Sequence, residues 1–245
     1  MIYDLDAIPE SWRHLDRTMK RAFFNAVPYL CLVSVILALY MAFVYAPTEK
    51  TMGDVQRIFY FHVASWWIAF LAFGVVFGGS VAYLITRDRI YDQTALASAE
   101  IGVLFTTIGL ITGPLWAKPA WGIYWTWDAR LTTALVLWLI YVGYLMLRRY
   151  IPDETKRANM AAVAGIIGFV DVPIVHFSIR WWRTQHPSPV VMGGPGSGLH
   201  PQMFHALMVS LLAFLFLYLW MLDKRLSIER AQEDIEHLHK ELEAI

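Results

Sequence analysis

Six stretches of mostly apolar residues constrain this chain more than any other feature, because a helix of about 20 such residues crosses the hydrocarbon core of a bilayer. They are Ala22 to Tyr45, Ile58 to Thr86, Thr94 to Ala117, Leu131 to Leu147, Ala158 to Ile179 and Met203 to Leu222. The chain is 58% hydrophobic and 16% charged, whereas soluble domains average about 45–50% and about 25%. We therefore expect an all-α polytopic membrane protein with six transmembrane helices, and not a soluble enzyme.

The distribution of Lys and Arg predicts how these spans are oriented, because basic loops close to spans stay in the cytoplasm. Most of the 20 basic residues lie in segment 1–21, in the connections after the second and fourth spans, and in the tail 223–245. Both termini are therefore predicted to be cytoplasmic. The outer face then carries the three remaining connections, 46–57, 118–130 and 180–202. The net charge is zero, so bulk electrostatics does not favour nucleic acid as a partner.

The predicted organisation is a cytoplasmic segment 1–21, a six-helix membrane domain 22–222 and a short, charged cytoplasmic helix 223–245. Apolar residues of this tail are three or four positions apart, at Ile228, Ala231, Ile235, Leu238, Leu242 and Ile245. Such a stripe suits either a helix resting on the protein or membrane surface, or docking to a cytoplasmic partner. The glycine-rich segment 193–198 predicts an irregular outer loop.

Segment 116–130 has the most unusual composition, since it holds four of the 11 tryptophans together with Pro, Gly, Asp and Arg. An interfacial aromatic belt explains scattered tryptophans, but a dense cluster beside charges favours a surface for a planar, apolar ligand with anionic groups, such as haem. Arg130 is the first candidate for a propionate contact and Arg57 the second. Asp128 either contacts the ligand or fixes the loop. The candidate haem-binding residues are Arg57, Trp116, Trp121, Tyr124, Trp125, Trp127, Asp128 and Arg130.

Haem iron also takes axial ligands, and neutral imidazole is a common one. His62 and His176 lie near the outer ends of the second and fifth spans, and we predict that they are the axial pair. Pro173 is expected to kink the fifth span just before His176. A rival pairing joins His62 to His205, while His186 is expected to be a loop residue without a ligand role.

Three motifs resemble one known family. WGIYWTWDARLT (Trp121 to Thr132) is similar to the tryptophan-rich WWD motif of haem-handling proteins in cytochrome c maturation. RIFYFHV (Arg57 to Val63) and VPIVHFSIRWW (Val172 to Trp182) resemble the haem exporter protein C (CcmC) branch. The resemblance covers about residues 20–222.

The resemblance implies a b-type, non-covalent haem at the periplasmic face of the bacterial inner membrane. His62 and His176 match the axial positions, and the WWD segment matches the haem-binding surface. The implied partners are the haem chaperone CcmE, which receives the haem, and ABC-type subunits with a small membrane subunit. The sequence has no GxxxxGK[ST] motif, so ATP hydrolysis is assigned to a partner. The chain is not expected to be an enzyme by itself, although lyase-like promotion of haem attachment to the chaperone stays open.

Two other classes of function remain open from the sequence. A membrane cytochrome b also binds haem through two histidines, and would transfer electrons or oxidise quinol. A purely structural permease subunit would make the Trp and His residues incidental.

Overall fold

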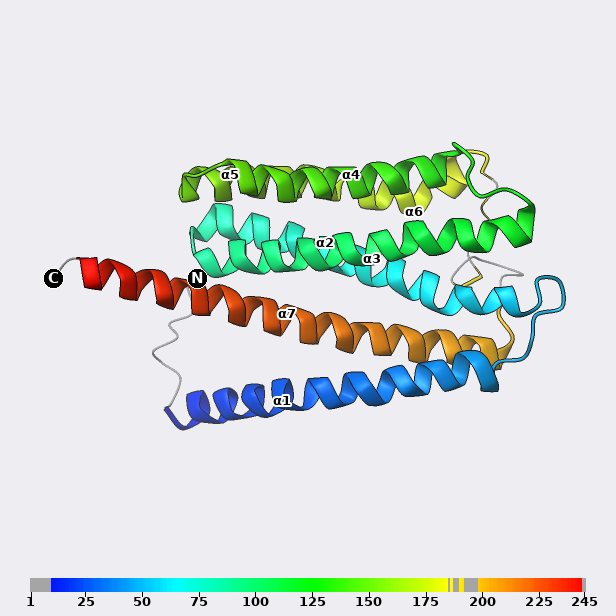
Figure 1. Ribbon diagram of the computed structural model, residues 1–245, viewed down its shortest axis with the longest axis horizontal. Coiled ribbons are helices and arrows are strands. Elements are labelled where there is room, and N and C mark those ends of the chain that lie inside the picture. Colours follow the sequence, from blue (N-terminus) through cyan, green and yellow to red (C-terminus); the bar gives the residue numbers. More distant parts are fainter. Residues whose placement is uncertain (1–9, 185, 187–189, 192–197, 244–245) are drawn as a thin grey trace.

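The computed structural model describes residues 10–184, 186, 190–191 and 198–243, most of them in helices (Figure 1). The membrane-domain elements, in chain order, are α1 (Glu10–Tyr40), the π-helical turn η2 (Met41–Tyr45), the 3-10 turn η3 (Asp54–Arg57), α2 (Ile58–Thr86), α3 (Arg89–Trp121), α4 (Ala129–Tyr150), α5 (Glu154–Phe169), α6 (Asp171–Trp181) and α7 (Pro201–Glu243).

Within the described residues, six helical segments are long and apolar enough to cross a membrane, which confirms the predicted all-α, six-span fold. They are Phe24–Tyr45, Asp54–Thr86, Arg89–Trp121, Ala129–Tyr150, Glu154–Trp181 and Pro201–Gln232. Several helices extend beyond the predicted apolar stretches, because polar caps start them earlier. Asp88, for example, accepts a 3.0 Å hydrogen bond from the backbone N–H of Ile90, so α3 begins before the apolar run.

The fifth span is interrupted at Val170, which separates α5 from α6. Pro173 has no N–H to donate to the carbonyl of Phe169, so the regular helical hydrogen bond cannot form there. The distortion predicted before His176 is therefore present, as a break between two helices rather than a smooth bend.

The sixth span and the tail form one helix, α7. No Gly or Pro occurs between Gln202 and Glu243, and Arg225 pairs with Glu229 one turn later at 2.5 Å, so the helix continues beyond the apolar run. Residues 223–243 of the predicted charged helix are thus an extension of the last span. Of the glycine-rich segment 193–198, only Gly198 lies within the described residues.

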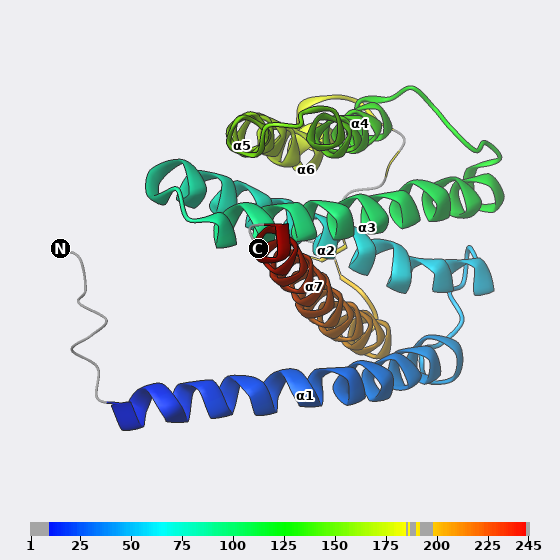
Figure 2. The same ribbon diagram turned by 60° about the vertical axis from the view of Figure 1, so that its left-hand side comes forward.

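The α2–α3 hairpin occupies the middle of the bundle, with α4, α5 and α6 on one side and α7 on the other (Figure 2). Helix α1 packs mainly against α7. The central core includes Phe73 stacked on Tyr141, with ring centroids 3.7 Å apart. The outward face of α1 and η2 is strongly apolar, as expected beside lipid, with exposed Tyr29, Leu32, Val33 and Ile36 on α1 and Phe43 and Val44 on η2.

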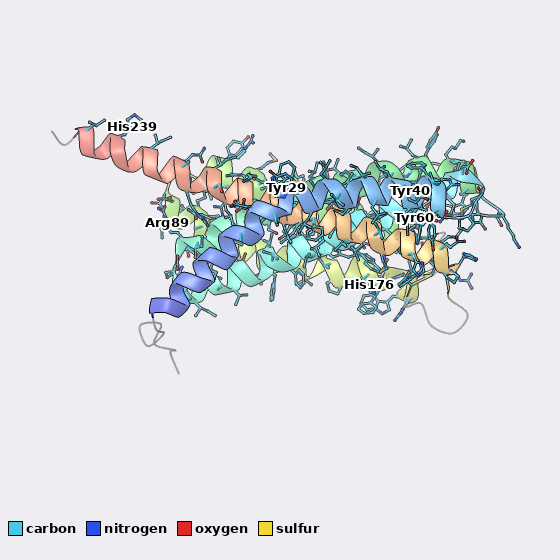
Figure 3. The ribbon with its side chains drawn as sticks, turned by 90° about the horizontal axis from the view of Figure 1, so that it is seen from below. Tyr29, Tyr40, Tyr60, Arg89, His176 and His239 are labelled. Carbon is cyan, nitrogen blue, oxygen red and sulfur yellow. The ribbon has the colours of Figure 1, made fainter. Side chains whose placement is uncertain are left out.

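The two ends of the bundle differ in chemistry. Arg89 and His239 lie at one end, while Tyr40 and His176 lie toward the other (Figure 3). The first end, which we call the basic end, contains ion pairs between helices: Arg148 with Asp92 at 2.6 Å and Arg225 with Glu100 at 2.6 Å. The opposite end, which we call the aromatic end, carries the connections 46–57 and 122–128 and the chain after α6 (Figure 1).

Candidate functional site

A pocket lies at the aromatic end, between the α2–α3 hairpin, the Trp-rich segment 116–130 and the start of α4. Its empty space, with the open mouth included, is about 710 Å³. Among the candidate residues, its walls include His62, Trp116, Trp121, Tyr124, Trp125, Asp128 and Arg130. Residues separated by up to 68 positions in the sequence therefore form one concave surface.

His62 lies near the start of α2 and is buried. Its Nδ1 atom is 2.9 Å from the hydroxyl oxygen of Thr112 on α3. The His62 ring meets the edges of Trp116 and Trp66 at centroid distances of 5.9 and 6.4 Å. Gly109 makes room for Trp66, because a Cβ at position 109 would lie 2.6 Å from the indole nitrogen. The imidazole is thus held between two helices inside an aromatic wall.

The end of α3 directs the Trp-rich segment across the pocket. Gly122 has a φ of 78°, a left-handed conformation that glycine adopts without strain. Its N–H donates to the carbonyl of Lys118 at 2.9 Å and closes the helix. Trp116 and Trp121 come from the last two turns of α3, with ring centroids 6.5 Å apart. Trp125 reaches the pocket from the connection that follows.

Two indole N–H groups of this wall are buried without a hydrogen-bond partner among the described residues: those of Trp116 and Trp125. A buried, unpaired donor is costly in free energy, typically about 1–3 kcal/mol. Acceptor atoms on a ligand would satisfy both groups. Flat aromatic walls, an imidazole and free N–H donors fit a planar ligand that carries carboxylates, as haem does.

Asp128 is the N-cap of α4. Its carboxylate accepts hydrogen bonds from the backbone N–H of Leu131 at 3.1 Å and from the hydroxyl of Thr126 at 2.8 Å. Burial raises the pKa of the Asp128 carboxyl, but the hydrogen bonds from Thr126 and Leu131 outweigh this effect, so its pKa lies below its ordinary value. Asp128 also lines the pocket. The sequence left two roles open for Asp128, and these hydrogen bonds support the one in which it fixes the loop.

Arg130 lines the pocket from the first turn of α4. Its Nη1 atom donates to the carbonyl oxygen of Val175 at 2.5 Å and to that of His176 at 3.3 Å. The guanidinium thus ties α4 to α6 and also places a positive charge beside the pocket. Five N–H donors leave capacity for a ligand carboxylate.

Three predicted residues do not line this pocket. His176 is exposed, and its ring contacts Phe177 at a centroid distance of 5.0 Å. Trp127 is 75% exposed, and its ring centroid lies 5.6 Å from that of Trp125. Arg57 instead donates to the carbonyl oxygen of Ala42 at 2.5 Å, because the π-helical end of the first span leaves carbonyls without helical partners.

The structure places His186 in the pocket, a residue that the sequence argument assigned to the loop. Its ring lies 6.5 Å from that of Trp121. The rival residue His205 lies elsewhere, beside Tyr45, with 3.4 Å between Nδ1 and the phenol oxygen. In the sequence, the one sign for His186 was its position in the predicted outer connection 180–202, and a connection's sequence does not tell which of its residues line a pocket.

Comparison with known proteins gives the family. The model of the protein family described as "Heme exporter protein C" matches residues 8–240 of this chain. The chain belongs to the haem exporter protein C family. A family member from Bradyrhizobium diazoefficiens is 38% identical over 197 residues, which cover 79% of this chain and 74% of the relative.

Two further relatives extend this likeness. The haem exporter protein C of Escherichia coli K12 is 34% identical over 197 residues, 78% of each chain. A relative from Marchantia polymorpha, described as a ccmC-like mitochondrial protein of cytochrome c biosynthesis, is 34% identical over 187 residues, covering 76% of this chain and 79% of the relative. All three motifs that resembled the haem exporter protein C family lie within the matched residues 8–240. The family assignment made from the motifs is therefore confirmed.

Proposed function

We propose that this chain holds haem at the periplasmic face of the bacterial inner membrane and delivers it for cytochrome c maturation. The observation that carries the proposal is a single pocket that combines His62 and His186 with aromatic walls, a guanidinium and unpartnered N–H donors. Membership of the haem exporter protein C family supports the same ligand.

We propose that His62 and His186 would hold the haem iron. Both line the pocket. In the sequence, His62 precedes the Trp-rich segment 116–130 and His186 follows it. This pair replaces the expectation that His176 is the second ligand, because the pocket is not lined by His176. Bound haem supplies an iron that accepts two imidazole nitrogens. The protein would hold the two imidazole rings in place, pack aromatic side chains against the porphyrin and exclude water.

The polar groups of the pocket are proposed to orient the ligand's carboxylates. Arg130 offers charged donors beside the pocket, and the indole N–H groups of Trp116 and Trp125 offer neutral ones. Asp128 acts on this arrangement indirectly, through the cap that places Arg130 on the first turn of α4. We propose a non-covalent b-type haem, because the pocket offers nitrogen ligands and hydrogen-bond donors to hold it.

The proposed partners are the haem chaperone CcmE on the periplasmic side, and ABC-type subunits with a small membrane subunit. An exposed aromatic surface beside the pocket, Trp121, Tyr124 and Trp127, offers the chaperone a place to approach. The cytoplasmic extension of α7 exposes Ile228, Ile235 and Leu242 at seven-residue intervals, and we propose this face for contact with the ATPase. Deleting residues 233–245 is expected to weaken copurification of that subunit and to leave haem content unchanged.

The absorption spectrum of the purified full chain tests the haem site. The wild type is expected to show six-coordinate, low-spin haem. His62→Ala and His186→Ala are each expected to lose haem or become partly high-spin, with recovery on adding imidazole. His176→Ala and His205→Ala are the matched controls, and they should keep the wild-type spectrum. A change in His176→Ala but not in His186→Ala would restore the pair expected from the sequence.

Delivery is tested separately, by mixing the haem-loaded chain with the purified chaperone and following the haem spectrum on each protein after separation. Transfer is expected from the wild type. A protein that binds haem but reacts rapidly with quinol and transfers none to the chaperone would instead be a cytochrome b.

A further inference from the structure

We propose that Thr112 is a positioning residue for His62, which fixes the proton on Nδ1 and presents the lone pair of Nε2 to the pocket. This inference rests on the proposed haem-binding function and adds a residue that lies outside the Trp and His motifs. It assigns no contact with haem to Thr112 itself.

The direction of the hydrogen bond follows from the partners of the Thr112 hydroxyl. Its oxygen is 2.7 Å from the carbonyl oxygen of Ile108, one turn earlier in α3. It is also 3.4 Å from the carbonyl oxygen of Gly109. Carbonyls only accept, so the single hydroxyl proton goes to this side, with Ile108 as the nearer acceptor. The hydroxyl oxygen can then only accept from His62, whose Nδ1 lies 2.9 Å away. Neutral His62 therefore carries its proton on Nδ1, and its Nε2 has a free lone pair.

The neighbouring residue Gly113 leaves space for the same edge of the His62 ring. A Cβ at position 113 would lie 3.3 Å from the Cε1 atom of His62 and 4.0 Å from Nδ1. Both atoms belong to the edge of the ring that faces Thr112, so a larger residue at position 113 would push the imidazole out of its place. Thr112 thus holds this edge by a hydrogen bond, and Gly113 leaves room for it.

A fixed tautomer has a chemical consequence for a ligand histidine. A hydrogen bond from Nδ1–H makes the opposite nitrogen a better electron donor and orients the ring, and removal of such a partner typically weakens metal binding by about 10–100-fold. Better donation also favours the ferric over the ferrous state, and so lowers the reduction potential of the haem.

The first test uses the haem-free full chain, so that its result is independent of haem binding. Nitrogen-15 NMR of histidine at about pH 8, where imidazole is neutral, is expected to show the Nδ1–H form of His62. Thr112→Val should raise the Nε2–H share, and Thr112→Ser should retain the wild-type tautomer. Thr106→Val is the matched control, because Thr106 makes the same bond to a preceding carbonyl, 2.6 Å to Gly102, in the same helix.

The second test measures the haem-loaded chain. Thr112→Val is expected to weaken haem affinity about 10–100-fold and to raise the reduction potential, whereas Thr112→Ser and Thr106→Val should stay close to wild type. Gly113→Ala should weaken affinity without changing the tautomer. An unchanged tautomer and unchanged potential in Thr112→Val would overturn the inference, as would an equal effect of Thr106→Val. Failure of the proposed function would give a different result. The wild type would then bind no haem, while NMR of the haem-free chain would still report the tautomer of His62.

Discussion

The guanidinium of Arg130 donates a 2.5 Å hydrogen bond to the backbone carbonyl oxygen of Val175. This bond joins the first turn of α4 to the middle of α6, across two helices that are about 45 residues apart in the chain. Arg130 therefore has a structural partner as well as a place in the pocket wall. Its two roles are separable by experiment.

Arg130→Ala is expected to destabilise the haem-free protein by about 2 kcal/mol, because the Val175 carbonyl loses a charged donor. Haem affinity should fall in addition. Thermal unfolding in detergent measures the first effect and haem titration the second. Arg180→Ala is the control, since Arg180 is exposed and its guanidinium carbon lies 5.8 Å from the ring centroid of Phe177. Wild-type stability in Arg130→Ala would mean that the bond to Val175 is weak or absent in solution.

Tryptophans inside and outside the pocket should differ when they are truncated. Trp125→Ala removes apolar surface from the wall and is expected to lower haem affinity about tenfold, which corresponds to about 1.4 kcal/mol. Trp127→Ala removes an indole that is 75% exposed, and should leave affinity within about twofold. Equal losses of haem affinity in the two variants would indicate that the two indoles act together as one surface. Unchanged haem affinity in both variants would assign the cluster to an interfacial belt.

The ion pair between Arg148 and Asp92 is expected to stabilise the basic end. Its two hydrogen bonds measure 2.6 and 2.7 Å, and the side chains are only 9% and 15% exposed. Asp92→Asn leaves a buried guanidinium without a counter-charge, and should cost about 3 kcal/mol of unfolding free energy. Glu154→Gln, which removes the exposed partner of Arg89, should cost less than about 1 kcal/mol. Equal losses of unfolding free energy in Asp92→Asn and Glu154→Gln would contradict the expectation that the buried ion pair contributes more than the exposed one.

Asp128 is expected to make stability depend on pH in the acid range. Its pKa in the folded chain lies below the ordinary value, so its contribution is complete above the ordinary Asp pKa of about 4 and is lost as the pH falls through the lower, folded value. Asp128→Asn keeps a capping oxygen but does not titrate. The stability advantage of the wild type over this variant should therefore shrink on acidification. A constant difference between pH 7 and pH 3 would show that the carboxylate charge is not involved.

The orientation in the membrane stays a prediction from the basic residues. Reporter tags fused at residues 50, 90, 122, 153, 190 and 245 are expected to report outside, inside, outside, inside, outside and inside. The fusion at residue 122 is decisive, because it lies in the pocket wall's connecting segment. A cytoplasmic report there would remove the periplasmic haem site.

Local sequence alone determined the spans and their caps. A run of apolar residues lowers its free energy in hydrocarbon wherever its neighbours lie, so six such runs predict six spans without knowledge of packing. The interruption before His176 also followed from one residue, Pro173, because the missing N–H is a property of proline itself. The three motifs likewise sufficed for the family, which the match over residues 8–240 confirms.

Tertiary structure alone decided which residues face the pocket. His62 and His176 are at similar depth by sequence, but helix packing turns His62 toward Thr112 and leaves His176 exposed beside Phe177. His186 lines the pocket although it follows the end of α6, and no periodicity in the sequence predicts this position. Span positions follow from local transfer free energies, whereas the direction in which a side chain faces depends on contacts between helices that are distant in sequence.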